Sequence, residues 1–214
     1  MNLQQQISFM QQEMIKEIPD EVLNTLMDAN AQMLSEMPGK IALKEGDVIP
    51  DFTLYRHNGE PLAIKDILQK KNLLISFYRG TWCPYCSVEL RALVKYYDAI
   101  KDAGAELVAI SPELPDHSMS QIEKEQIQFP VLSDPGNRIA GLFGIVVHLS
   151  EVLQKVYQGF DFDLVKKNGD LNWNLPIPAT YLVRQDGTIH YAYINPDYTQ
   201  RMEPDEIIQE LHLL

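Results

Sequence analysis

An apolar run of strand-forming residues, LLISFY (Leu73–Tyr78), constrains the fold of this 214-residue chain more than any other feature. Such a run, bounded by polar segments, is typical of a strand buried on both faces, as in a parallel sheet. It is followed by Cys83-Pro84-Tyr85-Cys86 and then by apolar residues at helical spacing from Leu90 to Ile100. The sequence therefore predicts a strand, and after it a helix that begins at the two cysteines of the chain.

Further strands and helices alternate along the chain. The strand ELVAIS (106–111) follows the first helix, and a polar helix over about 118–128 leads to the apolar segment FPVLSD. This order predicts a parallel sheet with right-handed crossovers. Hairpins are predicted at Asn58-Gly59 and at the turn 185–187, which joins ATYLV to TIHYAYI.

The segment 137–170 has a helical pattern. One short helix is predicted over 137–143 and another over 149–158, with Ser150 as its N-cap. A last helix is predicted from Pro204, because proline is favoured in the first turn of a helix.

Residues 1–40 differ in pattern from the rest of the chain. Apolar residues at helical spacing predict two amphipathic helices, the second beginning at Pro19, and six of the eight methionines lie in this segment. Methionine adapts to irregular surfaces, so these helices can form a partner or dimer surface or can pack on their own domain. Pro38-Gly39 marks a boundary. We therefore expect an N-terminal helical extension, residues 1–40, and a redox domain, residues 41–214.

The charge and the N-terminus limit the class of function. A net charge of −12 without a basic run disfavours binding to nucleic acid or to an anionic membrane. No apolar run approaches the ~18–20 residues of a membrane span, and no secretory signal pattern is visible. We expect a cytoplasmic protein. In that reducing compartment, a close cysteine pair indicates redox chemistry or metal binding.

The cysteine pair has the features of a redox site. Cys83 precedes Pro84 at the predicted helix start, where free N–H groups and the helix dipole favour a thiolate. Cys86 lies one helical turn further, close enough for a disulfide. We expect an exposed Cys83 to attack and a shielded Cys86 to resolve the intermediate.

The residues around the cysteines suggest further roles. The positive charge of Arg79 can favour the thiolate, and Trp82 can form an apolar shoulder for a substrate, although packing at the strand end explains both equally well. Zinc requires four ligands, and the five histidines form no second cluster near the cysteines, so no metal is expected.

Four segments resemble a known family. The W-C-x-x-C motif at 82–86 matches the thioredoxin type, and CPYC is its glutaredoxin version. Together the segments resemble the peroxiredoxin-like subgroup of the alkyl hydroperoxide reductase/thiol-specific antioxidant family; they are IPDFTL (49–54), FYRGTWCPYCSVEL (77–90), FPVLSDPGN (129–137) and PATYLVRQDGTI (178–189). The resemblance implies an α/β thioredoxin-like fold, with a central mixed sheet flanked by helices. It also implies that Pro178 is a cis-proline beside the cysteines, and that no cofactor is bound.

The chain departs from the family pattern Pro-x-x-x-Thr-x-x-Cys. When the pattern is aligned on Cys86, Arg79 stands at the proline and Cys83 at the threonine. When it is aligned on Cys83, Thr81 falls one place away from the threonine. The set that binds a peroxide is therefore altered, and the local residues favour dithiol–disulfide exchange.

Three functions follow from these observations. The first is a thiol-dependent antioxidant oxidoreductase that reduces hydroperoxides or disulfides and is regenerated by a thiol donor of the thioredoxin or glutathione type. The second is a disulfide reductase without peroxidase activity. The third is a non-enzymatic redox sensor, in which the disulfide controls binding of a partner by the methionine-rich helices.

Overall fold

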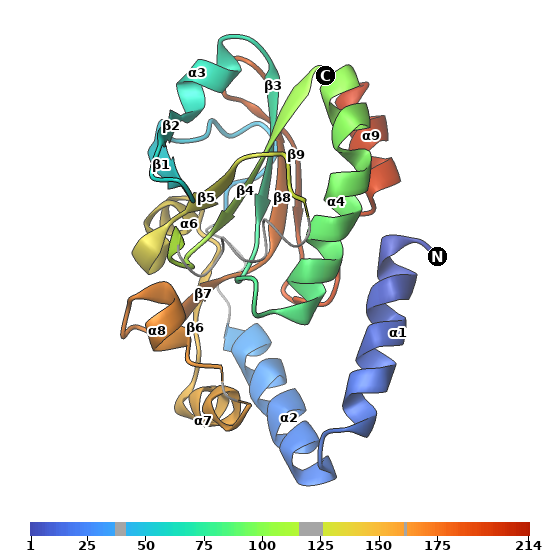
Figure 1. Cartoon of the computed structure of the whole chain (residues 1–214), viewed down its shortest axis with the longest axis vertical. Helices are drawn as coiled ribbons and strands as arrows, with labels where there is room; N and C mark the ends of the chain where they lie inside the picture. Colours follow the sequence, from blue (N-terminus) through green and yellow to red (C-terminus); the bar gives the residue numbers. More distant parts are fainter. Residues whose placement is uncertain (37–41, 116–125, 161) are drawn as a thin grey trace.

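A mixed β-sheet runs through the middle of the structure, a computed structural model that describes residues 1–36, 42–115, 126–160 and 162–214 (Figure 1). Within these residues, seven strands pair in the order β2-β1-β5-β4-β3-β8-β9. They are β1 (Thr53–Arg56), β2 (Pro61–Ala63), β3 (Asn72–Phe77), β4 (Ala105–Ser111), β5 (Val131–Ser133), β8 (Ala179–Val183) and β9 (Ile189–Ile194). β3, β4 and β5 are parallel, and the outer strands pair in antiparallel fashion. The predicted mixed sheet and both predicted hairpins are confirmed.

β3 is covered on both faces, as its apolar sequence predicts. Leu73, Ile75 and Phe77 belong to one hydrophobic cluster, whereas Leu74 belongs to a second cluster that also contains the two cysteines. Side chains alternate between the faces of a strand, so consecutive apolar residues fill two separate cores. The redox motif therefore follows a strand that is fixed from both sides.

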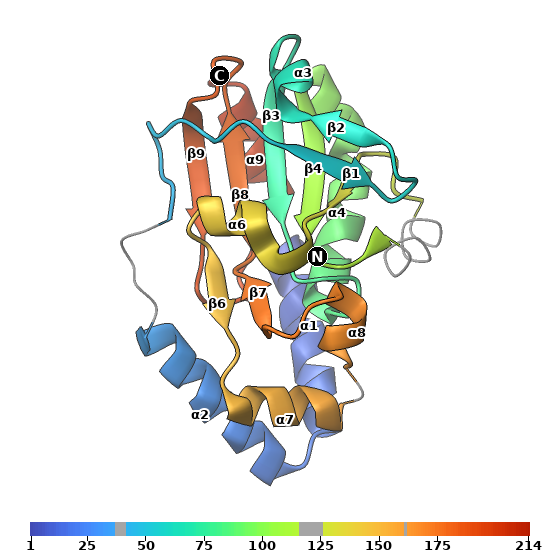
Figure 2. The ribbon, with the colours of Figure 1, turned by 90° about the vertical axis from the view of Figure 1, so that its left-hand side faces the viewer.

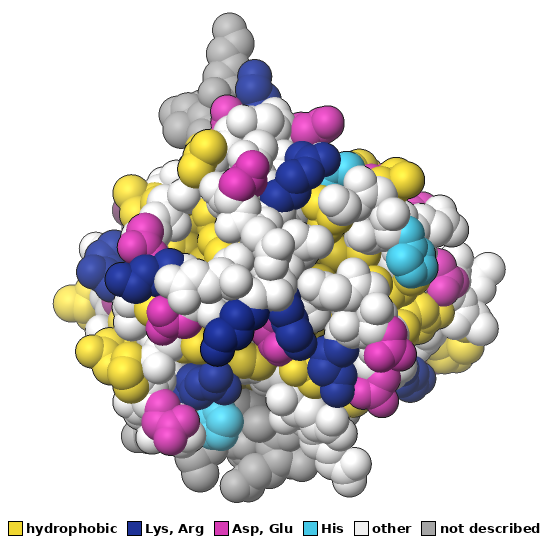
Figure 3. All heavy atoms as spheres, turned by 90° about the horizontal axis from the view of Figure 1, so that it is seen from above, with side chains coloured by type: hydrophobic (Ala, Val, Ile, Leu, Met, Phe, Trp, Pro, Cys, Tyr) yellow, Lys and Arg dark blue, Asp and Glu magenta, His cyan; other side chains and the backbone are white. Residues whose placement is uncertain are grey.

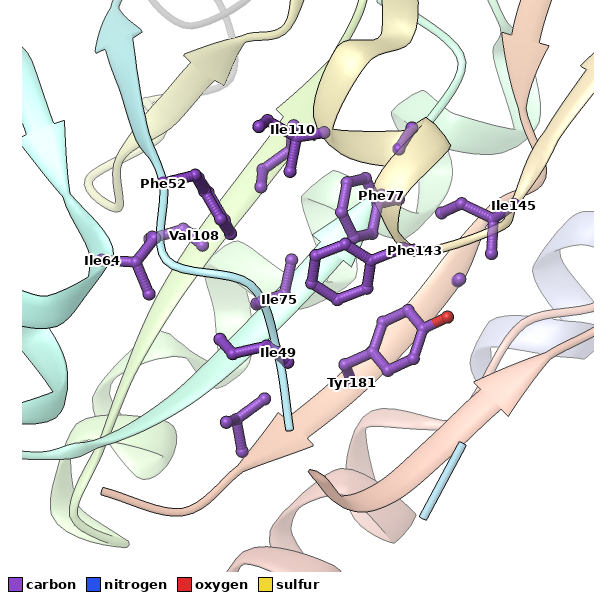
Figure 4. Close-up of a cluster of buried hydrophobic side chains, with 14 of the residues drawn as sticks. Ile49, Phe52, Ile64, Ile75, Phe77, Val108, Ile110, Phe143, Ile145 and Tyr181 are labelled. Carbon is purple, nitrogen blue, oxygen red and sulfur yellow. The ribbon is translucent and has the colours of Figure 1, made fainter. Parts of the chain in front are cut away.

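The first cluster is built around Phe143 (Figure 4). Its ring centroid lies 4.9 Å from that of Phe77 and 5.0 Å from that of Tyr181. Phe143 directly follows α6 (Arg138–Leu142), so this short helix anchors its end over the face formed by β3 and β8.

Two helices, α4 (Pro84–Asp102) and α9 (Pro204–Leu211), cover the opposite face of the sheet (Figure 1). Leu90, Leu93 and Ile100 of α4 are buried there, in agreement with the predicted apolar face of this helix. The short helix α3 (Ile64–Leu68) lies at the end of the sheet near β2.

The segment 137–170 is only partly helical. It contains α6, α7 (Glu151–Gly159) and α8 (Leu164–Asn168), preceded by a 3₁₀ turn at Pro135–Asn137. Ser150 caps α7 by accepting a hydrogen bond from the N–H of Leu153, as predicted. The prediction missed β6 (Val146–His148), which pairs with β7 (Asn174–Pro176), because strands of three residues are too short to show a period.

The two predicted N-terminal helices are present, as α1 (Leu3–Lys16) and α2 (Asp20–Glu36). They diverge from their connection at the lower end of the molecule, so that α1 runs beside α4 and α2 beside α7 (Figures 1 and 2). The predicted boundary at Pro38-Gly39 and most of the predicted helix over 118–128 lie outside the described residues. The described end of that segment, 126–128, is not helical.

Charges of both signs are mixed on the end of the molecule that carries α3 and the C-terminus (Figure 3). Lys and Arg side chains lie among Asp and Glu side chains on this face, in keeping with a solvated surface. No helix in the described ranges is long and apolar enough to cross a membrane.

Candidate active site

The loop that joins β3 to α4 turns sharply at Gly80. This glycine has a φ of +147°, and a Cβ atom at this position would lie 2.2 Å from Nε1 of Trp82. Only a residue without a side chain lets the indole ring fold back over the loop. The sequence Gly80-Thr81-Trp82 therefore fixes where the chain enters the cysteine motif.

Cys83 is the N-cap residue of α4 and Pro84 occupies the first turn, as predicted. The backbone carbonyl of Cys83 accepts the N–H of Ser87, which closes the first helical turn. Cys86 lies within that turn. The positive end of the helix dipole thus lies at the Cys83 sulfur, where it favours a thiolate.

Both sulfurs are enclosed. Cys83 is 1% exposed and Cys86 is 0% exposed, and both are free thiols. The prediction of a shielded Cys86 is confirmed, but the prediction of an exposed Cys83 is wrong. Cys83 is buried because Trp82 and Tyr85, on either side of it, pack onto other parts of the chain instead of facing solvent.

The environment separates the acidities of the two thiols. Burial alone raises the pKa of Cys83, but a hydrogen bond with Cys86 and the charges of Arg79 and Arg201 outweigh it and lower this pKa to about 6. Burial raises the pKa of Cys86 well above its usual value, and the neighbouring Cys83 adds to this effect. The arrangement thus favours a Cys83 thiolate beside a Cys86 thiol.

Arg201 is a site residue that the sequence did not indicate. Its side chain is buried, with Nε 2.7 Å from Oε2 of Glu89 and Nη2 3.6 Å from Sγ of Cys86. The pKa of Glu89 is raised to about 7, chiefly because burial disfavours its charge; Arg201 lowers this pKa and Cys86 adds to the increase. Glu89 lies one helical turn after Cys86. The signal that could have identified Glu89 is a charged residue at a helix position that is expected to be buried.

Arg79 lies in a cage of aromatic rings. Its guanidinium carbon is 4.3 Å from the ring centroid of Tyr198, 5.2 Å from that of Trp82 and 5.4 Å from that of Tyr157. It also donates a hydrogen bond to the hydroxyl of Tyr157. Among the described residues, no carboxylate lies within ion-pair distance of Arg79. Its positive charge lowers the pKa of Cys83, and its role in the reaction stays a prediction.

Trp82 packs within its own chain. Its ring lies 5.7 Å from that of Tyr157 and 5.6 Å from that of Phe162, measured between centroids. It joins a cluster that includes Ala29 of α2 and Leu153 of α7. The indole is thus a packing residue beside Cys83, and any contact with substrate remains a prediction.

Thr81 is held by Glu113, which the sequence also did not indicate. The backbone N–H of Thr81 donates to Oε2 of Glu113 at 2.9 Å, and its hydroxyl donates to Oε1 at 3.0 Å. Glu113 is buried in the segment that follows β4. The carboxylate therefore anchors the loop that carries Cys83 to the segment that follows β4.

Pro178 lies beside Arg79 but does not have the predicted conformation. It lines a small apolar pocket with Arg79, Tyr198 and Pro196. The prediction of a cis-proline is wrong, because all described peptide bonds, including the one before Pro178, are trans. The chain passes in extended form from β7 through Ile177 into β8. The N–H of Ile177 donates to the carbonyl of Ile145, and a trans bond continues this path.

A mixed sheet with a cysteine pair at a strand–helix junction is the arrangement expected of a thiol oxidoreductase with a thioredoxin-like fold. The model of the AhpC/TSA family matches residues 46–192, and the chain belongs to this family. The predicted family, fold class and enzyme type, a thiol-dependent peroxidase, are confirmed.

Individual relatives agree with this assignment. Peroxiredoxin Bcp of Escherichia coli strain K12 is 32% identical over 151 residues, which are 71% of this chain and 85% of the relative. Chloroplastic peroxiredoxin Q of Arabidopsis thaliana is 27% identical over 178 residues, 82% of this chain and 69% of the relative. The crystal structure of peroxidoxin BcpB from Mycobacterium tuberculosis has the same fold, with a TM-score of 0.62 at 19% identity, covering 80% of this chain and 98% of that one.

Proposed function

We propose that Cys83 is the attacking thiolate of a thiol-dependent peroxidase and that Cys86 closes an intramolecular disulfide with it. The observation that carries this proposal is the position of Cys83 at the start of α4, with a pKa lowered to about 6, beside a Cys86 held as a thiol. A thiolate is the nucleophilic form of cysteine, whereas a neutral thiol is suited to the second step.

The cycle has three steps. The Cys83 thiolate attacks the terminal oxygen of a hydroperoxide and the O–O bond breaks, so that the hydroxyl group stays on Cys83 as a sulfenic acid. The leaving alkoxide takes up one proton from solvent, equivalent to the proton that Cys83 lost on ionisation, and departs as an alcohol. The Cys86 thiol then displaces water and forms the Cys83–Cys86 disulfide. Two thiols of a donor reduce this disulfide to the dithiol and are oxidised to their own disulfide.

The surrounding residues serve this cycle. Arg79 and Arg201 stabilise the thiolate by their positive charges, and Thr81 holds the loop in place through Glu113. Trp82 and Pro178 form apolar walls next to Arg79. We assign Arg79, Thr81, Trp82 and Pro178 to the surroundings of the substrate on these contacts.

A steady-state assay tests the proposal. Reduced protein is mixed with excess hydroperoxide and either a thioredoxin or a glutathione reducing system. We expect turnover in the wild type and none in Cys83→Ser. In Cys86→Ser, a mixed disulfide with the donor should form through Cys83. If Cys83→Ser instead traps a mixed disulfide through Cys86, the two roles are reversed.

A disulfide reductase is the second candidate, and one observation favours it. Arg79 occupies the position of the family's proline when the pattern is aligned on Cys86, so the usual peroxide-binding set is altered. Reduction of a model disulfide without turnover of peroxide would select this function. A single oxidation without turnover of either substrate would select the redox sensor.

The remaining assignments concern the setting of the enzyme. A dithiol that must be reduced in every cycle suits a reducing compartment, and we assign the protein to the cytoplasm on this ground. The division into an extension, residues 1–40, and a redox domain, residues 41–214, stays a prediction. So does a homodimer formed through the N-terminal helices, which light scattering would detect as a doubled mass.

A further inference from the structure

We propose that the two N-terminal helices restrict the cysteine pair to small molecules, both as oxidant and as reducing thiol. We call α1 and α2 together the helical cover. This proposal deepens the proposed function by naming the size of its substrates. It depends on the enclosure of both sulfurs, whichever of them attacks.

α1 is docked on the site at its N-terminal end. The carboxylate of Glu203 accepts the backbone N–H groups of Leu3 at 2.9 Å and Gln4 at 2.8 Å. These N–H groups begin the helix and have no partner within it, so the carboxylate also meets the positive end of the dipole. The side chain of Gln4 accepts the backbone N–H of Arg201 at 3.3 Å and donates to the carbonyl of Thr199 at 3.4 Å.

The contacts of α1 continue along α4. Leu3 and Ile7 are buried in a cluster with Val88 and Ala92, and Tyr85 of the cysteine motif packs against this cluster. Ile7 is fully buried, at 0% exposure. One side of the motif is thereby closed by α1.

α2 closes the other side. Ala29 is buried in a cluster with Leu149, Leu153 and Tyr157, and Trp82 packs against that cluster. The side chain of Asn30 donates to the hydroxyl of Tyr198 at 3.4 Å. Trp82 and Tyr85, which flank Cys83, are thus engaged by different helices of the cover.

The cover also contacts the loop that supplies two site residues. Tyr198 stacks on Arg79, and Asn30 of α2 donates a hydrogen bond to the Tyr198 hydroxyl. Arg201 approaches Cys86, and Gln4 of α1 accepts a hydrogen bond from the backbone N–H of Arg201. Figures 1 and 2 show that both helices lie toward the end of the molecule where α4 begins, α1 beside α4 and α2 beside α7. The cover, the loop and the motif therefore form one packed unit.

This enclosure selects by size. Thiol–disulfide exchange requires a thiolate to reach a sulfur atom of its partner, and a folded protein cannot bring its disulfide to a sulfur that is 1% exposed. A small hydroperoxide or thiol needs only a narrow path. A small apolar pocket lined by Arg79, Leu149, Pro178, Pro196 and Tyr198 lies next to the site through Arg79, although neither cysteine lines it.

Alkylation of the reduced full-length protein tests the proposal without using its activity. N-ethylmaleimide and a maleimide carried on polyethylene glycol share one reactive group and differ in size. We expect the small reagent to label the wild type at least about tenfold faster than the large one, relative to a cysteine peptide. That ratio corresponds to about 1.4 kcal/mol. Mass spectrometry identifies the labelled cysteine.

Two matched substitutions on α1 locate the cause. Ile7→Ala weakens docking of α1 on α4, whereas Ile15→Ala changes a side chain that is 37% exposed on the same helix. We expect Ile7→Ala to lower the small-to-large rate ratio by at least about tenfold, again about 1.4 kcal/mol, and Ile15→Ala to leave it unchanged. If Ile7→Ala does not fold, Glu203→Ala, which removes only the anchor of the α1 N-terminus, replaces it.

The outcomes separate this proposal from the proposed function. If both reagents label the wild type at equal relative rates, the proposed role of the helical cover is wrong. It is also wrong if the small-to-large rate ratio is equal in folded Ile7→Ala and Ile15→Ala. If labelling is selective but the peroxide assay fails, the size selection by the helical cover is supported and only the proposed peroxidase function is contradicted.

Discussion

Arg201 Nη2 lies 3.6 Å from Sγ of Cys86, although the two residues are 115 positions apart in the chain. The same guanidinium pairs with Glu89 through Nε, so one buried cation joins a carboxylate and the redox pair. Burial without such a cation would strongly disfavour any negative charge at this place. The charge of the site therefore depends on the combined protonation states of Arg201, Glu89 and the cysteine pair.

Glu89 should make stability depend on pH. Its carboxyl has a pKa of about 7 in the folded chain against an ordinary 4.5, because burial disfavours the charge. Between these pH values the folded state holds more protons than the unfolded state, so the free energy of unfolding falls as pH rises. We expect a loss of about 3 kcal/mol from this group.

Glu89→Gln provides the comparison. Urea unfolding of the wild type and of Glu89→Gln at several pH values isolates the contribution of the carboxyl as the difference between the two curves. A difference that does not change between pH 4.5 and 7 would contradict the raised pKa.

Cys83 should react as a thiolate at unusually low pH. The rate of alkylation by iodoacetamide should rise with pH around a midpoint near 6 and then level off, because only the thiolate reacts. In Arg79→Gln the midpoint should move upward by about 1 unit, since loss of a nearby positive charge disfavours the thiolate.

Arg79→Lys is the matched variant for this measurement. It keeps the charge and loses the planar group that stacks on Tyr198, so we expect a midpoint close to that of the wild type. The same upward shift in both variants would show that stacking, and not charge, controls the thiolate.

Gly80→Ala should be strongly destabilising. The added Cβ would lie 2.2 Å from the indole of Trp82 at a φ of +147°, so both a clash and backbone strain result. We expect a loss of at least about 2 kcal/mol in thermal or urea unfolding. Gly59→Ala is the control, because its φ is +81° but nothing lies within 4 Å of the added Cβ. It should lose only about 1 kcal/mol.

The Thr81–Glu113 contact should contribute to stability through two separate bonds. Thr81→Val removes the hydroxyl bond and should cost about 1 kcal/mol, whereas Glu113→Ala also leaves the partly buried N–H without its acceptor and should cost about 1–3 kcal/mol. Urea unfolding measures both, with Glu60→Ala as an exposed control. Equal losses in Thr81→Val and Glu113→Ala would show that the N–H bond is of no consequence.

Local features of the sequence identified the reactive centre. Pro84 after Cys83, a buried strand before it and apolar spacing after it are contained within about 30 residues, so the helix start and its effect on the thiol could be predicted. The positions of β3, β4 and β8 follow from the same kind of local pattern.

Features formed by distant residues were not predictable in this way. Arg201, Tyr198 and Tyr157 come from a loop and a helix that reach the motif only in the folded chain, and no local pattern shows that they meet it. The burial of Cys83 was missed for the same reason, because its neighbours are engaged by helices of the N-terminal segment. The reactivity of Cys83 could be predicted from local sequence, whereas its access to solvent depends on tertiary contacts.

The bond between Leu3 and Glu203 spans 200 residues of sequence. During synthesis, α1 is made 200 residues before the loop that receives it. The nascent chain therefore carries its cysteine motif without the segments that enclose it until this loop has been made and has joined α1. Until then, both thiols are open to reagents of any size.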